Sequence, residues 1–552
     1  MFENPDYIVI GSGSAGSTIA YRLGENPSHQ VLVLEFGGSD FSPFIQMPAA
    51  LSYPMNMPKF DWGYKAEPEP ELNGRSLVCP RGRVIGGSSS INGMIYVRGN
   101  PGDYHEWARS GATGWDYPDV LPYFQRMEKS HGGTSEFRGS HGPLHVTHGK
   151  RDNPLHEAFV SAAQQAGYER TEDYNGYRQE GFGPADMTVH NGSRFSTAKA
   201  YLKPALAKKN VKLVTRALVD KIIFEGKKAV GVEFFHQGQK KIIKVKKDVI
   251  LSAGSINSPA ILQRSGIGNA DHLKNLGIEV RSHLPGVGEN LQDHLEVYFQ
   301  VKCLQPITLY KYLNPFSKLL IGMQWMFLKS GPGATNQFET LGFIRSDKNI
   351  SYPDIQFHFL PVAIRYDGKA PSEGHGFQLH VGPMRSGSRG HVKINTSDPQ
   401  KAPTIKFNYM SHEDDFPTFR KALRLSREIL SQSAMDPFNG GEIQPGNDVI
   451  TDDGLDEFIR NNCESAYHPC GTCRMGQRED PTTVVENDCK VKGFSNFFLA
   501  DSSIFPRICN GNLNSPSIMT GEKASDHILG KAPLTPSNLK SFVHPDWQNT
   551  QR

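Results

Sequence analysis

The pattern of hydrophobic and polar positions is clearest at the start of the chain. A short β-branched run at residues 6–10 predicts a buried strand, and the Ala, Ile and Leu spacing of residues 17–23 predicts a helix. Residues 31–34 (Val-Leu-Val-Leu) predict a second buried strand, which ends on Glu35. A strand, a helix and a strand in immediate succession are typical of an α/β fold.

The turn between the first strand and the helix consists of small residues that match the pattern G-x-G-x-x-G. Gly11 permits a tight turn, Gly13 lets the backbone approach a pyrophosphate, and Gly16 lets helix and strand pack closely. The helix N-terminus adds free N–H groups for phosphate, and Glu35 lies where a carboxylate accepts hydrogen bonds from a ribose diol. This arrangement predicts a site for FAD or NAD rather than NADP, whose extra phosphate Glu35 would repel. The residues expected in this part of the site are Gly11, Ser12, Gly13, Ser14, Ala15, Gly16 and Glu35.

Two later segments have a similar organisation. A buried strand at 249–254 runs into a glycine turn and a helix at 258–265, and an apolar strand at 496–500 ends on Asp501 before a helix at 517–529. Because the first of these repeats the architecture of the N-terminus, we expect it to join the same sheet. Further elements are expected as helices at 154–167, 196–208 and 414–431, a strand at 211–214, and a hairpin at 229–234 and 241–245.

Between residues 300 and 460 the spacing of apolar residues changes to every second position. Residues 355–360, 376–381 and 390–394 alternate apolar and polar side chains, which predicts half-buried strands of an antiparallel sheet. Residues 36–70 lack a period and are rich in Pro, Gly, Met and aromatics, which predicts a functional lid or extension.

The predicted fold class is α/β plus α+β. It comprises a Rossmann-like nucleotide-binding domain of residues 1–151, 193–299 and 464–532, a substrate domain of 152–192 and 300–463 with an antiparallel sheet backed by helices, and a loosely held tail of 533–552.

Composition excludes several classes of protein. With 60 basic against 57 acidic residues the net charge is only +3, which gives no reason to expect nucleic acid as a partner. The residues before the first strand lack the basic and apolar regions of a secretory signal, and the most apolar later stretch, 319–328, is too short to span a bilayer. Seven cysteines, an odd number, predict reduced thiols in the cytoplasm. Peripheral attachment to the inner face of the cell membrane is left open.

Three further motifs carry a family resemblance. The run Gly-Arg-Val-Ile-Gly-Gly-Ser-Ser-Ser-Ile-Asn from residue 82 resembles the first signature of the glucose–methanol–choline (GMC) flavin oxidoreductases, and residues 254–268 resemble the second. With a histidine loop at 465–472, the likeness runs from about residue 5 to 530. A narrower likeness, to the choline-oxidising members of the family, is carried by residues 46–50, 67–70, 89–94, 290–296 and 358–362.

The resemblance implies an enzyme that oxidises an alcohol by hydride transfer to N5 of FAD. It implies choline as the substrate and betaine aldehyde as the product, with a further step to glycine betaine left open, for osmoprotectant synthesis. His468 matches the position of the catalytic base in the family, and imidazole titrates near neutral pH as such a base must. Asn512 matches the second catalytic position, with Asn514 as the alternative. Whether electrons pass to a respiratory quinone or to oxygen is left open.

The FAD is expected to be bound without a covalent bond. In some family members a histidine just before the asparagine of the first signature is joined to the flavin, and here that position is Ile91. Beyond the first loop, the residues expected to contact the cofactor are Arg83, Gly86, Gly87, Ser88, Asn92, Gly93, Val219, Ala253, Gly254 and Asp501.

The substrate pocket is predicted from the chemistry of choline, a permanent cation without N–H donors. Such a cation calls for aromatic faces and a carboxylate, and Glu339 is the first choice for the carboxylate. The other expected substrate-binding residues are Trp62, Tyr64, Phe357, His358 and Tyr467, each of which could equally be an ordinary core residue.

Several alternatives remain open at this point. Cys470 and Cys473, just after His468, could form a redox dithiol or a metal site, but a structural zinc site usually has two ligand pairs. We therefore favour small packing residues and expect no metal.

Another alcohol dehydrogenase or oxidase of the family would carry the same motifs. Hydroxynitrile lyases share the fold and use FAD without redox chemistry, and His468 would serve them as a base too. A flavin-binding structural protein is disfavoured because His468 and Asn512 both match catalytic positions.

Overall fold

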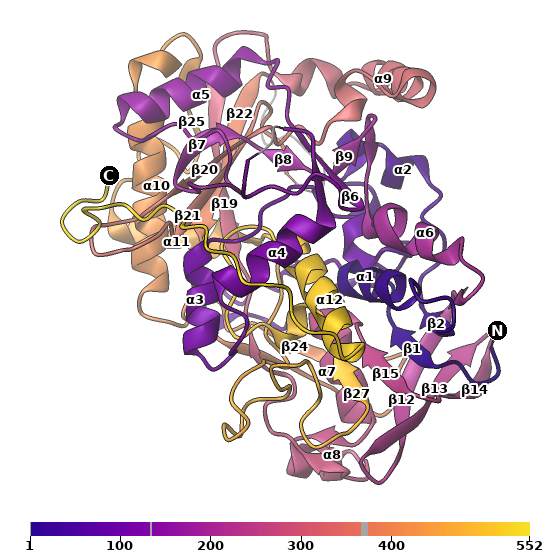
Figure 1. Ribbon diagram of the computed structural model, residues 1–552. Helices are drawn as coiled ribbons and strands as arrows, with labels where there is room; N and C mark the ends of the chain where they lie inside the picture. Colours follow the sequence, from indigo (N-terminus) through magenta and orange to yellow (C-terminus); the bar gives the residue numbers. More distant parts are fainter. Residues whose placement is uncertain (1, 133–134, 366–373) are drawn as a thin grey trace.

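A computed structural model describes residues 2–132, 135–365 and 374–552 (Figure 1). One half of the molecule is organised around a five-stranded parallel sheet with the strand order β11-β2-β1-β15-β27. Pairing is parallel throughout, so the segment after residue 248 joins the N-terminal sheet as expected. The strands are β1 (Tyr7–Ile10), β2 (Val31–Leu34), β11 (Val211–Val214), β15 (Asp248–Leu251) and β27 (Phe497–Leu499).

Three helices begin where strands of this sheet end. α1 (Ser14–Leu23), α7 (Gly254–Arg264) and α12 (Asn514–Ile528) each start three or four residues before the apolar pattern indicated. Their first turns consist mostly of small and polar residues, and some of these line the cavity described below. These turns therefore lack the apolar spacing from which the helices were predicted. α1 packs on α12, and α12 packs on α4 (Tyr117–Met127).

The expected hairpin is part of a three-stranded antiparallel sheet that packs on α7. The other half of the molecule contains a seven-stranded antiparallel sheet, one face of which is covered by α5 (Pro154–Gln165) and α10 (Asp415–Leu430). The strands of the smaller sheet are β12 (Ala217–Glu225), β13 (Lys228–His236) and β14 (Gln239–Lys244). Those of the larger are, in order, β25 (Asn439–Gln444), β19 (Leu295–Cys303), β22 (Gly376–Pro383), β21 (Ile355–Leu360), β20 (Thr340–Ile344) and β7 (Gly181–Pro184), with β26 (Glu464–Ser465) beside β19.

Three expectations about this half need correction. β21 and β22 are buried on both faces rather than on one, because their polar face is turned toward the first half of the molecule. β23 (Gly390–Lys393) does not join the large sheet but pairs with β18 (Glu289–Leu291) and β24 (Thr404–Lys406). The predicted domain boundary at 299/300 falls inside β19, and this strand pairs with β22 and β25 of the large sheet.

The remaining elements are short. Segment 36–70 contains α2 (Pro43–Gln46) and single turns of helix rather than a freestanding lid, and much of it is buried. The helix expected at 196–208 is a π-turn (Ala198–Leu202) followed by α6 (Lys203–Leu206). The other helices are α3 (Pro101–Arg109), α8 (Ala270–Asn275), α9 (Pro315–Leu328) and α11 (Asp452–Asn462). The other strands are β3 (Tyr64–Lys65), β4 (Val78–Cys79), β5 (Glu128–Ser130), β6 (Leu144–His148), β8 (Asp186–Met187), β9 (Val189–His190), β10 (Ser193–Arg194), β16 (Ile267–Gly268) and β17 (Ser282–His283).

Two surface features complete the fold. α9 lies at the edge of the molecule with most of its apolar side chains exposed (Figure 1). Among the described residues, no helix has the length and hydropathy needed to cross a membrane. The C-terminal tail, expected to be loosely held, lies along both halves of the molecule. The amide of Leu534 donates to Tyr123, and Arg345 donates to the carbonyl of Thr550.

Candidate active site

A continuous cavity runs from the glycine-rich loop after β1 to the polar face of the large antiparallel sheet. Gly13 and Glu35 line one part of it, and His358 and His468 line another. The cavity is therefore walled by both halves of the molecule, and its parts differ in chemistry.

The glycine-rich loop has the geometry that its sequence predicts. Gly11 has φ +94°, in the left-handed region that favours glycine, and a Cβ on Gly16 would lie 2.1 Å from the carbonyl oxygen of Gly11. A Cβ on Gly13, by contrast, would meet only the Cα of Gly87, at 4.0 Å. Gly11 and Gly16 therefore shape the turn and its packing, and Gly13 leaves open space for a ligand.

Two carboxylates fasten this end of the cavity. Glu35 accepts hydrogen bonds from the backbone N–H (2.9 Å) and hydroxyl (2.8 Å) of Ser12 and from the N–H of Gly37 (2.7 Å). Burial raises the pKa of Glu35, and these hydrogen bonds oppose that shift. Asp501 accepts from the N–H of Gly254 (2.8 Å) and the hydroxyl of Ser258 (2.6 Å), which ties β27 to α7.

The N-termini of α1, α7 and α12 converge on this end. In none of the three does the N-cap residue's own side chain accept a hydrogen bond, although the first N–H of α7, at Gly254, donates to Asp501. Residues of each first turn line the cavity. Free backbone N–H groups and positive helix ends are suited to phosphate, so this end of the cavity fits the pyrophosphate of a dinucleotide. A Cβ on Gly254 would meet nothing within 4 Å, which again leaves room for a ligand.

A second loop, residues 82–93, packs against the first. Arg194, almost fully buried, donates to the backbone oxygen (2.7 Å) and side-chain oxygen (2.8 Å) of Asn92 and to the carbonyl of Ser89 (3.2 Å). This arginine was not predicted as a site residue, because nothing in the pattern around it signals its distant partners. Ile91 lines the cavity at the position where a covalent attachment would require a histidine.

Most of the predicted cofactor residues line the cavity, and four do not. Ser12 is bonded to Glu35, Gly16 packs helix against strand, Gly86 forms a turn at φ +85°, and Arg83 donates outward to the carbonyl of Pro58. The predicted residues that do line it are Gly11, Gly13, Ser14, Ala15, Glu35, Gly87, Ser88, Asn92, Gly93, Val219, Ala253, Gly254 and Asp501.

The loop that carries His468 is held by a buried carboxylate. Asp293 accepts hydrogen bonds from the backbone N–H of His468 (2.6 Å), from the hydroxyl of Tyr409 (2.6 Å) and from that of Ser465. Asp293 lies within residues 290–296, a stretch used above only for its family likeness, so its role was missed. Asp293 fixes the backbone from which the imidazole of His468 projects.

Hydrogen bonding sets the tautomer of His468. His294 Nε2 lies 2.9 Å from the carbonyl of Met384, which can only accept, so His294 carries its proton on Nε2. His294 Nδ1 must then accept from His468 Nδ1, at 3.0 Å. His468 consequently keeps its Nε2 lone pair, which lies 3.0 Å from the amide nitrogen of Asn512. Burial lowers the pKa of His468 well below its usual 6.5, so the ring is neutral at physiological pH.

Asn512, rather than Asn514, contacts His468. The side-chain oxygen of Asn514 accepts from Ser14 at 2.8 Å instead and fastens α12 to α1. The side-chain oxygen of Asn512 and the Nε2 of His358 are both buried and make no bond among the described residues that meets hydrogen-bond geometry, although Asn512 lies close enough to His358 to raise its pKa against the larger effect of burial. Buried polar atoms are usually satisfied, so these two atoms mark a place for a polar ligand group beside His468.

The substrate end differs from the prediction in its carboxylate. Glu296 lines the cavity, is 4% exposed, and lies 2.7 Å from Nδ1 of His380. Glu339 does not line it. Its carboxylate accepts from the backbone N–H of Arg151 (2.6 Å) and from the hydroxyl of Thr335. Glu296 lies two residues after His294, on the same side of an extended chain, which places it beside the ring that His294 supports.

The predicted aromatic residues divide in the same way. Trp62, Tyr467 and His358 line the cavity, as does Phe338. Phe357, adjacent to His358 on β21, points to the opposite face of the sheet and packs in the core against Phe182. Tyr64 stacks behind Trp62 at 5.6 Å and donates its hydroxyl proton to Asn257.

The two cysteines after His468 lie in the hydrophobic core. Cys470 and Cys473 are both fully buried free thiols. Burial raises the pKa of each well above its usual value, which keeps both protonated. Neither belongs to a group that could hold a metal among the described residues.

Comparisons with known proteins agree with this geometry. Two GMC oxidoreductase profiles match residues 5–296 and 386–521. The chain is 60% identical over 547 residues to the oxygen-dependent choline dehydrogenase of Brucella suis biovar 1 (strain 1330), covering 99% of this chain and 100% of the relative. It is 56% identical to the oxygen-dependent choline dehydrogenase of Rhizobium rhizogenes, again covering 99% of this chain and 100% of the relative. A pyridoxine 4-oxidase from Mesorbium loti has the same fold, with a TM-score of 0.87, 29% identity, and coverage of 96% of this chain and 100% of that one.

Proposed function

Because the chain belongs to the GMC oxidoreductase family, we propose that it oxidises choline to betaine aldehyde with FAD bound in the cavity. The observation that carries the proposal is the arrangement of His468, Asn512 and Glu296 along one cavity wall. The relatives named above act on choline according to their names. When bound, FAD supplies the hydride acceptor for the carbinol carbon.

His468 is the base in this proposal. Its Nε2 lone pair faces Asn512, and the hydrogen bond through His294 to the Met384 carbonyl keeps the ring proton on Nδ1. A choline hydroxyl that replaces the hydrogen bond between Asn512 and His468 donates its proton to Nε2 and accepts a hydrogen bond from the amide. The neutral ring can accept that proton, whereas a charged imidazolium could not.

Glu296 binds the trimethylammonium group, in place of the Glu339 favoured by sequence. It is a buried carboxylate beside His358, and Trp62, Phe338 and Tyr467 supply aromatic faces in the same cavity. Aromatic faces and a carboxylate together suit a cation that has no N–H donors. The hydroxyl and the ammonium of one small molecule can then be held at the same time.

FAD is held without a covalent bond in this proposal. Ile91 offers no nucleophile, while Glu35 and the N-termini of α1, α7 and α12 supply acceptors and donors for the ribose and phosphates. The experiment that tests the overall function is anaerobic addition of choline to the flavin-loaded enzyme. Bleaching of the flavin with formation of betaine aldehyde supports it. An unchanged flavin spectrum would favour a non-redox lyase, and bleaching by other alcohols alone would favour a different oxidase of the family. Glycine betaine among the products would add the second step.

The electron acceptor has two candidates. The names of the relatives support oxygen. The exposed face of α9 supports a membrane quinone, because a bilayer surface fits that face. Phe316, Met326, Phe327 and Leu328 are each more than half exposed, and residues 297–338 contain four lysines and no acid. An apolar helix flanked by lysines binds anionic lipid, whereas two copies of it would repel each other.

Vesicles distinguish these candidates. We expect the enzyme to sediment with vesicles containing phosphatidylglycerol and a quinone, and to reduce that quinone. Phe327→Ser with Leu328→Ser should abolish sedimentation, while Val543→Ser, an exposed apolar residue on the tail, should not. Failure of the wild type to sediment, with oxygen consumed at full rate, would leave oxygen as the acceptor.

A further inference from the structure

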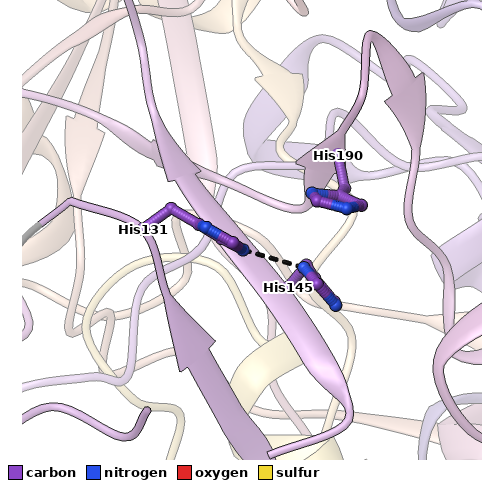
Figure 2. A group of neighbouring side chains, drawn as sticks. All are labelled: His131, His145 and His190. Carbon is purple, nitrogen blue, oxygen red and sulfur yellow. Dashed lines mark hydrogen bonds between the residues drawn. The ribbon is translucent and has the colours of Figure 1, made fainter. Parts of the chain in front are cut away.

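Three histidines from three neighbouring segments gather apart from the residues that line the cavity. His131 follows β5, His145 lies on β6, and His190 ends β9. Their side-chain nitrogens lie within 4.8 Å of one another, and Figure 2 shows the three rings around a common space. His131 is exposed and the other two are half-buried, so the group is accessible to a small ion.

The rings are close enough to act together. The ring centres of His145 and His190 are 3.9 Å apart, and those of His131 and His145 are 4.9 Å apart. His131 Nε2 and His145 Nδ1 are 2.8 Å apart, a hydrogen bond in which one nitrogen donates and the other accepts (Figure 2). Three imidazoles gathered in this way can each present one nitrogen to a single metal ion.

We propose that His131, His145 and His190 bind one transition-metal ion of the zinc class, with water in the remaining position. A tetrahedral zinc site with Zn–N bonds of 2.0–2.1 Å places its nitrogens about 3.3 Å apart. The present spacing, from 2.8 Å to no more than 4.8 Å, brackets that value, so small ring rotations close the site. On binding, two metal–nitrogen bonds replace the His131–His145 hydrogen bond. The donating ring carries that proton on its other nitrogen once the metal is bound, so both imidazoles stay neutral overall and no proton has to be released.

The surroundings select the class of ion. Lys129 and Lys199 lie near these rings, and their charges contribute to the lowered pKa of His190. The nearby Asp186 carboxylate is already paired with His148 and Arg138. Hard ions such as Mg²⁺ and Ca²⁺ need oxygen ligands, whereas imidazole suits zinc, copper and nickel. The two lysines oppose every cation alike, so it is the all-nitrogen ligand set that excludes the former ions and fits the latter.

The site would also stiffen part of the flavin cavity. His190 pairs with Ser193 in the β9–β10 hairpin, and Arg194 of the same hairpin holds Asn92. An ion shared by His131, His145 and His190 joins this hairpin to β5 and β6. We therefore expect zinc to raise both the unfolding temperature and the temperature of flavin release.

The test uses the flavin-loaded enzyme, prepared without a histidine tag and stripped with a chelator. Isothermal titration with ZnCl₂ should show one saturable site per chain, and metal analysis after gel filtration should find one equivalent retained. MgCl₂ should give no binding. The unfolding temperature and the temperature of flavin release should both rise on addition of zinc.

Variants distinguish this site from general binding to surface histidines. His131→Ala removes an exposed ligand with little risk to folding, and it should abolish the retained equivalent and the temperature shifts. His145→Ala with His190→Ala should do the same, with flavin content confirming that the fold is intact. His141→Ala, an exposed histidine outside the group, should bind zinc as the wild type does. Zinc retention unchanged by His131→Ala, or no retention by the wild type, would overturn the proposal and leave the rings as a hydrogen-bonded stack.

Discussion

Replacing Glu296 tests the substrate orientation most directly. Glu296→Gln removes one negative charge from a buried position without changing the size of the side chain. At an effective dielectric constant of 20, two unit charges about 5 Å apart interact by about 3 kcal/mol. Glu296 already lies 2.7 Å from His380 Nδ1, so part of its charge is offset. We therefore expect a loss of about 2 kcal/mol for a cationic substrate, or about 30-fold in kcat/KM.

The assay compares choline with 3,3-dimethylbutan-1-ol, its neutral isostere of the same shape. Any general disturbance of the cavity, including the loss of the His380 contact, lowers kcat/KM for both alcohols, so the ratio of the two isolates the charge. Glu339→Gln is the matched control, because this glutamate is equally buried but bonded to Arg151 and Thr335 outside the cavity. The ratio should fall in Glu296→Gln and stay constant in Glu339→Gln. A constant ratio in Glu296→Gln would refute the reasoning, and a fall in Glu339→Gln alone would restore the residue that the sequence favoured.

Four further predictions concern the base and the cofactor. His468→Ala should slow anaerobic reduction of the flavin by choline by about 10²–10⁴-fold, with Asn512→Ala doing less damage, and a wild-type rate in the first variant would remove His468 from the mechanism. Because burial lowers the pKa of His468, this base stays neutral as the pH falls through 6.5. The rate of flavin reduction by choline should therefore begin to fall only below that pH. A rate that already falls above pH 6.5 would contradict this assignment. Glu35→Gln should weaken FAD binding by about tenfold to a hundredfold, since it removes charge-assisted hydrogen bonds worth about 1.5–3 kcal/mol, and unchanged flavin content after dialysis would count against it. Acid precipitation should release all FAD into the supernatant, whereas flavin in the pellet would reveal a covalent bond despite Ile91.

Local signals were sufficient for the nucleotide end of the site. Gly11, Gly13, Gly16 and Glu35 act within one strand–turn–helix unit, so their spacing along the chain also defines their spacing in space. The parallel order of the main sheet follows from the same unit and its partial repetition after residue 248. Motif likeness added His468 and Asn512, which the structure brings within 3.0 Å of each other.

Long-range contacts decided the substrate end. Glu296 and Glu339 are both buried glutamates beside strands of one sheet, and no local pattern separates the one that lines the cavity from the one that does not. The alternation of β21 was correctly predicted, yet its polar face is buried rather than solvated, which makes His358 a wall of the cavity and Phe357 part of the core. Which face meets solvent depends on what packs against the sheet.

The sequence by itself therefore determined the fold class, and it indicated the proposed cofactor site and the residue proposed as the base, because the motifs behind these predictions are short and local. Only the tertiary structure assigned the tautomer of His468, through His294 and a carbonyl from a third segment. It also grouped His131, His145 and His190 from three separate strands. A hydrogen bond or a shared ligand site depends on distances of a few ångströms between distant segments, and those distances are set by the packing of the whole chain.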